Sequence, residues 1–319
     1  MFFVTLKSLL CYKKLTMRSP VTGGNRVELI TTFPTESIVK IYEKDLKVDT
    51  RRFFKGVPAV ELYECSDTGY RFYYPEGILG DGQFYADLNK GNEGYYPADK
   101  WEHKYAISQI NHGAKVLEIG SGDGFFLEQM RKASLNAIGL ELNLDAIAKG
   151  EKKGLRIYNE MIEDHAEAHP GEYDVVCCFQ VLEHIYNVKS FLDASIKALK
   201  KGGKLIIGVP NNNPYLFKQD KWHTLNLPPH HAGLWNRRAF TELQKFYDVT
   251  PQDIIVEPLS NTKSFAKQWY LAQKNYYKGT KPVLGALMSL IPSPVYKVFV
   301  KLFSRWIDGF NIVAVFTKN

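Results

Sequence analysis

A glycine-rich segment near the middle of the chain has the composition of a ligand-binding loop. An apolar run ending at Ile119 leads into the pentapeptide 120–124 (GSGDG), and an amphipathic run from Phe125 to Met130 follows it. Glycines at alternate positions permit a tight turn and leave backbone amides uncovered, so a ligand can approach them closely. The pattern predicts a strand, a turn and a helix that together hold a cofactor.

The same loop does not fit a dinucleotide. The dinucleotide fingerprint needs a small residue where this sequence has Phe125, and Asp123 at the helix start disfavours a phosphate. The next apolar run ends in Glu141, whose carboxylate can accept hydrogen bonds from both hydroxyls of a ribose. These features predict a nucleoside ligand without a pyrophosphate. The alternative is a structural turn followed by a solvated glutamate.

Three histidines are candidates for proton transfer. His184 follows an apolar run, and His230 and His231 lie in a proline-stiffened Pro-Pro-His-His segment. Imidazole titrates near neutral pH and can accept the proton of a reacting hydroxyl. The alternative is that these rings only shape a pocket through hydrogen bonds.

An α/β sheet is the element that must position these residues. Downstream of Trp101, short β-branched runs alternate with amphipathic stretches, including a crossover helix from Val188 to Leu199. Open parallel sheets bind ligands at the carboxyl ends of their strands, which is where the glycine loop, Glu141 and His184 fall. The expected strands are 115–119, 137–141, 155–158, 174–179 and 204–209, with a later pair at 253–257 and 311–316.

Four motifs in this region carry a family resemblance. VLEIGSGDG, GLELN, YDVVCCFQVLEHI and LKKGGKLIIGVPN, in this order and spacing, resemble the successive motifs of class I S-adenosylmethionine-dependent methyltransferases, particularly the branch with a VLEH segment. The resemblance covers about residues 101–257 and resumes at 311–318. It implies a Rossmann-like α/β fold with a seven-stranded sheet whose last strand is antiparallel, S-adenosyl-L-methionine as cofactor, and methyl transfer as the reaction.

The resemblance also implies site residues. The loop and Glu118 would line the methionine part of the cofactor, and Glu141 would bind its ribose. The segment after the third strand would flank the adenine, although the usual Gly-Asp is missing there. Gln180 and Val181 would face the sulfonium. The implied cofactor-binding set is Glu118, Gly120, Ser121, Gly122, Asp123, Gly124, Glu141, Leu142, Glu160, Met161, Gln180 and Val181, and the catalytic candidates are His184, His230 and His231. No acidic set of the kind found in metal-dependent catechol-type methyltransferases is present, so no catalytic metal is expected.

Residues 1–100 are expected to form a small aromatic-rich domain of short strands and loops, and residues 101–319 the methyltransferase domain. Two N-terminal glycine turns resemble zinc knuckles in which Ser19, Thr22 and Thr68 replace cysteines and only Cys65 remains. One thiol and three hydroxyls cannot supply the ligands of structural zinc, so we expect this domain to be metal-free. Chance similarity of two glycine turns is the alternative.

A helical insertion at 258–309 is strongly basic. From Pro258 to Ile307 it contains eight Lys or Arg and no Asp or Glu, in a chain whose net charge is +7. Lys297, Lys301 and Arg305 share one face of an amphipathic helix. The insertion is interpreted either as a contact with an anionic membrane surface or a lid over an anionic acceptor, or as an element whose apolar face packs on the sheet or on a second copy.

Composition limits the remaining possibilities. The 319 residues have 45% hydrophobic and 24% charged side chains, typical of a folded globular protein. Adjacent Cys177 and Cys178 in an apolar run favour a reduced, cytoplasmic location, peripheral to a membrane if the basic insertion binds one. The longest apolar stretch is interrupted by prolines and lysine, so no transmembrane segment is expected.

The preferred function is O-methylation of a saccharide-like or lipid-linked small acceptor, with the upstream aromatics available to stack on sugar faces. A catalytically idle cofactor-binding scaffold is an alternative, opposed by the intact glycines and Glu141. A nucleic-acid methyltransferase is favoured by the net charge but opposed by the lack of an Asn-Pro-Pro-Tyr motif after the fourth strand.

Overall fold

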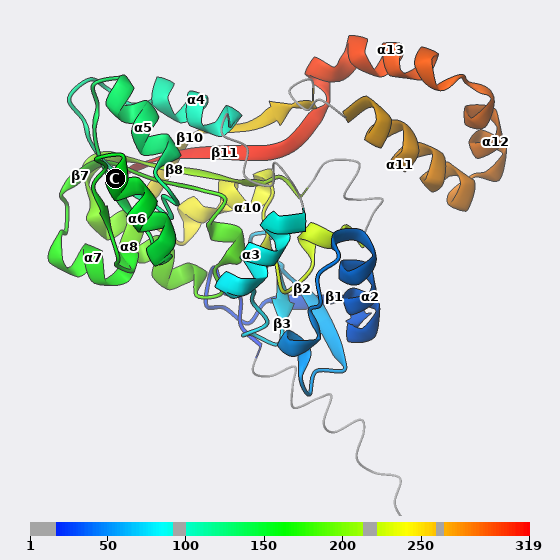
Figure 1. Cartoon of the computed structure of the whole chain (residues 1–319), viewed down its shortest axis with the longest axis horizontal. Helices are drawn as coiled ribbons and strands as arrows, with labels where there is room; N and C mark the ends of the chain where they lie inside the picture. The colour runs from blue at the N-terminus through cyan, green and yellow to red at the C-terminus, as the bar shows by residue number, and fades with distance from the viewer. Residues whose placement is uncertain (1–16, 92–99, 213–221, 260–264) are drawn as a thin grey trace, which may run out of the picture.

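The computed structural model describes residues 17–91, 100–212, 222–259 and 265–319. Two sheets form the body, and a helical arm extends from it (Figure 1). Cys11 lies outside the described residues.

The larger sheet has seven strands in the order β10-β11-β8-β7-β4-β5-β6. The pairs from β8 to β6 are parallel, and β11 runs antiparallel to both of its neighbours. This confirms the predicted fold class, including the antiparallel last strand. The strands are β4 Lys115–Ile119, β5 Asn136–Leu140, β6 Ile157–Tyr158, β7 Tyr173–Phe179, β8 Leu199–Pro210, β10 Val249–Pro258 and β11 Asp308–Lys318.

Helices cover both faces of this sheet, which explains why its central strands are apolar at nearly every position. Cys177 packs in the core that contains residues of α4 and α5, and Cys178 in the core that contains residues of α7, α8 and α10. Both thiols are buried, and burial raises the pKa of each. The helices are α4 Trp101–Ser108, α5 Phe125–Lys132, α6 Leu144–Lys152, α7 Ile162–Ala168, α8 Val188–Ala198 and α10 Arg237–Glu242.

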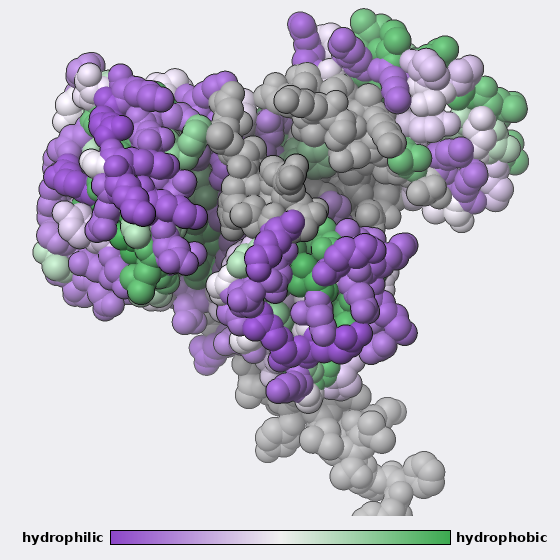
Figure 2. All heavy atoms as spheres, in the orientation of Figure 1, coloured by the Kyte–Doolittle hydropathy of each residue, from purple (hydrophilic) through white to green (hydrophobic). Residues whose placement is uncertain are grey.

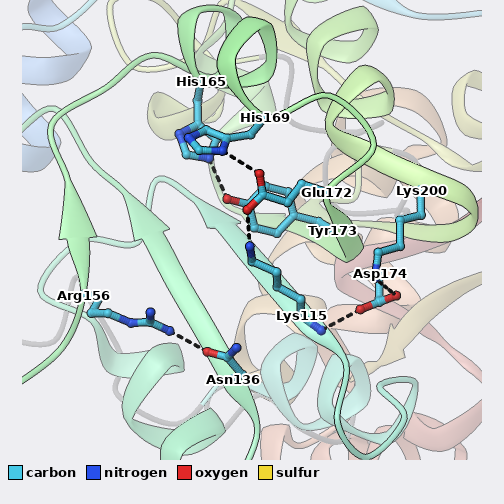
Figure 3. Close-up of polar contacts among 9 residues, drawn as sticks. All are labelled: Lys115, Asn136, Arg156, His165, His169, Glu172, Tyr173, Asp174 and Lys200. Atoms are coloured by element: carbon cyan, nitrogen blue, oxygen red, sulfur yellow. Dashed lines mark hydrogen bonds and ion pairs between the residues drawn. The ribbon is translucent and has the colours of Figure 1, made fainter.

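A polar network fastens the amino ends of the strands, at the edge opposite the glycine loop (Figure 3). The Lys115 amide donates to Asp174 at 2.8 Å, and the Lys200 ammonium donates to the same carboxylate at 2.7 Å. Glu172 contacts the Lys115 ammonium and His169. These bonds lower the pKa of both carboxyls, so the network holds β4 and β7 in register as ionised groups.

The smaller sheet is antiparallel and has the order β1-β2-β3-β9. Its last strand, β9 (Gly233–Leu234), lies more than 150 residues after β3 in the sequence. Glycine fits at position 233 because a Cβ there would lie 1.7 Å from the Tyr70 hydroxyl oxygen. Tyr70 and Trp235 share one core, so residues before and after 100 pack together; the domain boundary at 100 stays a prediction. The other elements are β1 Val27–Pro34, α2 Thr35–Leu46, β2 Ala59–Cys65, β3 Arg71–Tyr74 and α3 Gly82–Gly91.

The expectation of short strands and loops in residues 1–100 was wrong at α2 and at α3. Phe84 and Leu88, one helical turn apart, are fully buried, and the Phe84 amide donates to the Asp81 carboxylate at 2.9 Å. A capping residue followed by apolar residues at i and i+4 indicates a helix. The many glycines and aromatic residues around it made this pattern hard to recognise in the sequence.

The four knuckle positions do meet in space. Ser19, Cys65 and Thr68 are buried, and the Thr22 hydroxyl lies 4.0 Å from the Cys65 sulfur. Burial opposes ionisation of the Cys65 thiol, but hydrogen bonds from Ser19 and Thr68 outweigh it and lower its pKa. Hydroxyls therefore surround the one thiol, and the metal-free state of this region stays a prediction.

The insertion is helical, with α11 Phe265–Thr280, α12 Pro282–Leu290 and α13 Ser293–Phe303. We refer to residues 265–306 as the arm. Within the described ranges no single helix is long and apolar enough to cross a membrane; α12 and residues 293–306 meet the length and composition only as a pair bent by 101°.

Candidate functional site

The glycine loop adopts backbone conformations that favour glycine. Gly120, Gly122 and Gly124 have φ values of 71°, 54° and 85°. A Cβ would lie 2.4 Å from the Val181 side chain at Gly120 and 2.2 Å from the Leu155 side chain at Gly124, but would meet no protein atom within 4 Å at Gly122. The outer two glycines therefore permit packing within the protein, whereas the middle one borders open space that a ligand can use.

Two buried polar side chains at this edge have no partner among the described residues. Glu118, at the carboxyl end of β4, is 3% exposed, and its Oε2 has no hydrogen bond; the Ser121 hydroxyl is also unpartnered. Burial raises the pKa of Glu118 well above its usual range. Buried polar atoms are nearly always paired, so these two indicate a bound group that is cationic or donates hydrogen bonds.

Glu141 connects the ends of three strands. Its carboxylate accepts from the amides of Gly122, Leu142 and Asn143, each at 2.8 Å, and the Asn159 side chain donates to its carbonyl at 3.0 Å. Oε1 accepts two of these bonds and Oε2 accepts one, so Oε2 retains lone-pair capacity for a further donor. The arrangement places Glu141 beside the open space at Gly122, as a ribose contact requires.

The remaining predicted cofactor residues divide into two groups. Leu142 and Met161 are apolar side chains 58% and 46% exposed, suited to cover an adenine ring. Two carboxylates are already engaged: Asp123 pairs with Lys153 at 3.1 Å, and Glu160 lies 2.7 Å from a ring nitrogen of His165.

Gln180 begins the segment that passes over the loop. Its φ is 60°, and its side-chain amide donates to Glu102 at 3.3 Å and to Asn311 at 3.4 Å. Glu102 is almost fully buried, and burial raises its pKa. Asn311 in turn donates to Glu257 at 2.7 Å. Sequence reasoning missed Glu102, Asn311 and Glu257, because they come from a helix and two late strands with no motif of their own.

The structure brings the two predicted histidine segments together. The ring centroid of His184 lies 5.1 Å from the ring centroid of His230 and 5.1 Å from that of His231. The ring centroids of His230 and His231 are 4.3 Å apart. The backbone holds them there, since the Ala232 amide donates to the Glu183 carbonyl at 2.8 Å. Burial lowers the pKa of His184 to about 4 and that of His230 to about 3, so both rings are neutral at pH 7.

Hydrogen bonds fix the proton positions of two rings. The Nδ1 of His184 lies 2.6 Å from the His230 carbonyl oxygen, and the Nδ1 of His230 lies 2.7 Å from the Leu225 carbonyl oxygen. A carbonyl can only accept, so both Nδ1 atoms carry the proton and the lone pair is on Nε2. The Tyr85 hydroxyl lies 3.1 Å from the Nδ1 of His184; sequence reasoning did not select Tyr85.

A buried carboxylate adjoins the cluster. Glu183 is 1% exposed, its Oε2 has no hydrogen bond among the described residues, and its Oε1 lies 3.7 Å from the Nε2 of His184. Burial raises its pKa to about 8. The site therefore combines a loop that is open at Gly122 with a largely buried cluster of three imidazoles and one carboxyl.

Comparisons with known proteins agree with this arrangement. A family model described as a methyltransferase domain matches residues 95–249. The ubiquinone biosynthesis O-methyltransferase of Sodalis glossinidius is 33% identical over 108 residues, which are 32% of this chain and 43% of that protein. The enzyme of the same description from Aliivibrio fischeri is 36% identical over 125 residues, 35% of this chain and 53% of that protein. The chain thus spans about half the length of these curated relatives.

A solved structure shares the fold. A chain in the complex between a methyltransferase activator and a methyltransferase of Haloferax volcanii superposes with a TM-score of 0.52 at 13% identity, covering 76% of this chain and 97% of that one. The family match, the strand order and the four motifs are consistent with one another, and S-adenosyl-L-methionine is the cofactor of the methyltransferases that these motifs resemble. Residues 95–249 are thus similar to a methyltransferase domain, and the motifs in this region resemble those of class I S-adenosylmethionine-dependent methyltransferases.

Proposed function

We propose that the chain transfers a methyl group from S-adenosyl-L-methionine to a hydroxyl oxygen of a small acceptor. The observation that carries the proposal is one sheet edge that combines an unpartnered buried carboxylate, an open glycine and a cluster of neutral histidines. The similarity to O-methyltransferases over a third of the chain supports oxygen as the acceptor atom.

The donor side follows from the polar atoms at the loop. Glu118 would pair with the ammonium of the methionine part, and Glu141 would accept from the ribose hydroxyls. Bound in this way, the cofactor supplies an electrophilic methyl carbon on its sulfonium. Val181, which packs against Gly120, closes the loop on the side of β7. The histidine cluster forms the acceptor side, where it assists loss of the hydroxyl proton.

A matched pair of glycine substitutions tests donor binding. Gly122 and Gly113 both have positive φ, and a Cβ at either meets no protein atom within 4 Å, but Gly113 lies in the turn before β4, at the opposite edge. Backbone strain is therefore similar in Gly122→Ala and Gly113→Ala. Calorimetry is expected to show wild-type donor affinity in Gly113→Ala and a loss of at least about 10-fold in Gly122→Ala, equivalent to ~1.4 kcal/mol. Equal affinity in the two variants would remove the loop from the donor site.

For the acceptor, we propose a lipid-linked molecule rather than a saccharide. Four of the upstream aromatics expected to stack on sugar are core residues: Tyr70, Phe72, Tyr73 and Phe84 are each at most 3% exposed. The arm, in contrast, has a large exposed apolar surface (Figure 2). Its exposed apolar residues are Leu271, Val283, Leu284, Leu287, Leu290, Ile291, Val295, Val298, Phe299, Leu302, Phe303 and Trp306.

The arm buries only a narrow strip of α13. Tyr296 and Val300 pack with Tyr270 of α11, whereas Phe299 and Leu302 remain 60% and 65% exposed. Packing of this apolar face on the sheet, one of the interpretations of the sequence, is therefore absent from the described part of the chain. Exposed apolar side chains together with basic residues and no acidic ones suit the interface of an anionic membrane.

The root of the arm lies at the site. The arm leaves the sheet after β10 and returns at β11, where Asn311 contacts both Gln180 and Glu257. Contact of the arm with a membrane would hold the acceptor side close to molecules embedded in that membrane. The arm thus connects membrane binding to the choice of acceptor.

Liposome sedimentation tests the membrane contact. Each basic residue near an anionic surface contributes about 1 kcal/mol, so Lys297→Glu with Lys301→Glu should weaken binding to anionic vesicles by about 30-fold or more. Lys55→Glu with Lys132→Glu changes the net charge equally at exposed positions outside the arm and should have little effect.

Rising salt should weaken the binding of the wild type to anionic vesicles. Equal, salt-independent binding to anionic and neutral vesicles, or equal losses in the two double variants, would contradict the proposal. A dimer in lipid-free solution that dissociates on Leu290→Glu would assign the apolar face to a second copy instead.

A further inference from the structure

The histidine cluster has the geometry of a metal site. One ring nitrogen from each of His184, His230 and His231 lies within 4.8 Å of the other two. In the part of the chain that the structure describes, this is the one group of three or more His, Cys, Asp or Glu residues so arranged. His230 and His231 are 5% and 3% exposed and the His184 side chain is 22% exposed, so the three rings converge below the surface with His184 on the solvent side.

The hydrogen bonds around the cluster match those that orient metal-binding histidines. Such histidines usually donate the proton of one ring nitrogen to a carbonyl or carboxylate, which directs the other nitrogen to the metal. His184 and His230 donate from Nδ1 to the carbonyls of His230 and Leu225 in this way. Neutral imidazoles with fixed protons are the form that binds metal.

Two unpartnered polar atoms point independently to a missing cation. The Nδ1 of His231 is buried with no hydrogen bond, and so is the Oε2 of Glu183. Buried polar atoms without partners are uncommon in folded proteins. A divalent cation would give the imidazole a ligand bond and the Glu183 carboxylate a compensating positive charge.

We propose that His184, His230 and His231 bind one divalent transition-metal ion, with Zn²⁺ as the reference ion. Imidazole is a preferred ligand of zinc, at about 2.0–2.1 Å, so the three nitrogens would move closer together around the ion. Three protein ligands leave a fourth position open, which is the pattern of catalytic rather than structural zinc. The site differs from the cysteine knuckle near Cys65, and it departs from the sequence-based expectation of no catalytic metal.

The role of the ion rests on the proposed function, although its binding does not. The open position would take the acceptor hydroxyl, and coordination would lower the pKa of that hydroxyl, so that its proton passes to solvent. The resulting oxygen forms a bond to the methyl carbon while the carbon–sulfur bond breaks. The products are then a methyl ether and the uncharged thioether S-adenosylhomocysteine.

Metal titration of the full chain tests the inference. After removal of metal with a chelator, Zn²⁺ added in a calorimeter is expected to bind at one ion per chain, and Co²⁺ is expected to give the visible absorption of a four-coordinate site. His230→Gln and His231→Gln should each weaken binding by more than the 10- to 100-fold that changes around metal ligands cost. His112→Gln, at an exposed histidine, and Cys65→Ser, at the knuckle, are the matched controls and should bind as the wild type does.

Absence of stoichiometric binding, unchanged affinity in both histidine variants, or loss of binding in Cys65→Ser would overturn the inference. Circular dichroism and donor calorimetry on the same samples show whether each variant is folded. Donor binding without metal binding would refute the metal site alone, and metal binding without donor binding would refute the proposed function alone.

Discussion

Replacing His184, His230 or His231 singly by alanine is expected to lower the rate of methyl transfer by about 10²- to 10⁴-fold while donor affinity stays near that of the wild type. In the proposed function the three clustered rings are on the acceptor side, and the donor contacts come from the loop and Glu141. Removing one ring therefore removes assistance to proton loss without changing the donor site.

Single-turnover rates at saturating donor, with donor affinity measured separately by calorimetry, distinguish the two effects. His112→Ala is the control, since His112 is exposed and lies in the turn before β4. Full activity in all three cluster variants would eliminate the histidines from the chemistry. A parallel loss of donor affinity would reassign them to the donor site.

Substituting Glu118 by glutamine should affect stability and donor binding in opposite directions. The carboxylate is buried with an unpartnered oxygen, so it destabilises the ligand-free fold, and the neutral amide should relieve that cost. The ammonium of the donor, however, would lose its ionic partner. Loss of one member of a buried charge pair costs about 2 to 5 kcal/mol, or roughly 30- to 4,000-fold in affinity.

The pH dependence gives this prediction a second readout. Because the folded-state pKa of Glu118 is raised, its unfavourable contribution is absent below the unfolded pKa and grows as pH rises above it. The gain in thermal stability of Glu118→Gln should accordingly be larger at pH 7 than at pH 4.

Glu172→Gln is the control variant, and its expected change in stability at pH 7 has the opposite sign to that of Glu118→Gln. Its bond to Lys115 lowers the pKa of Glu172, so this carboxylate stabilises the fold above its unfolded pKa and the contribution is lost as pH falls. The variant should lose stability at pH 7 and bind donor normally. If the Glu118→Gln protein were less stable than the wild type yet bound the donor with wild-type affinity, Glu118 would not be the partner of the donor ammonium.

The strands of the large sheet could be predicted from the sequence because the patterns that indicate them are local. Each predicted strand of the large sheet contains a short apolar run; β4 matches the predicted bounds at both ends, whereas β8, β10 and β11 extend beyond theirs. Gly120, Gly122 and Gly124 indicated the loop because glycine adopts their positive φ angles without strain.

What the sequence could not supply depends on contacts between distant segments. Tyr85 and His184 meet across 99 positions, and Gln180 and Asn311 across 131. No local pattern encodes such pairs. The convergence of His184 with His230 could be expected only in outline, because it involves bonds between distant segments, from the Ala232 amide to the Glu183 carbonyl and from His184 to the His230 carbonyl. Exposure of the arm was also undecided, since an amphipathic pattern does not specify which surface covers it.

The most direct test of the central claim is transfer of a labelled methyl group by the wild-type chain. The protein is incubated with S-adenosyl-L-methionine carrying label in its methyl group, with divalent zinc, and with polyprenylated phenols, their soluble phenol analogues, saccharides or RNA in vesicle suspension. We predict hydroxyl-dependent incorporation of label as a methyl ether, greatest for the polyprenylated phenols on anionic vesicles, with one S-adenosylhomocysteine formed per methyl transferred. Saturable donor binding with no label in any hydroxyl compound, or label found only in RNA, would contradict it.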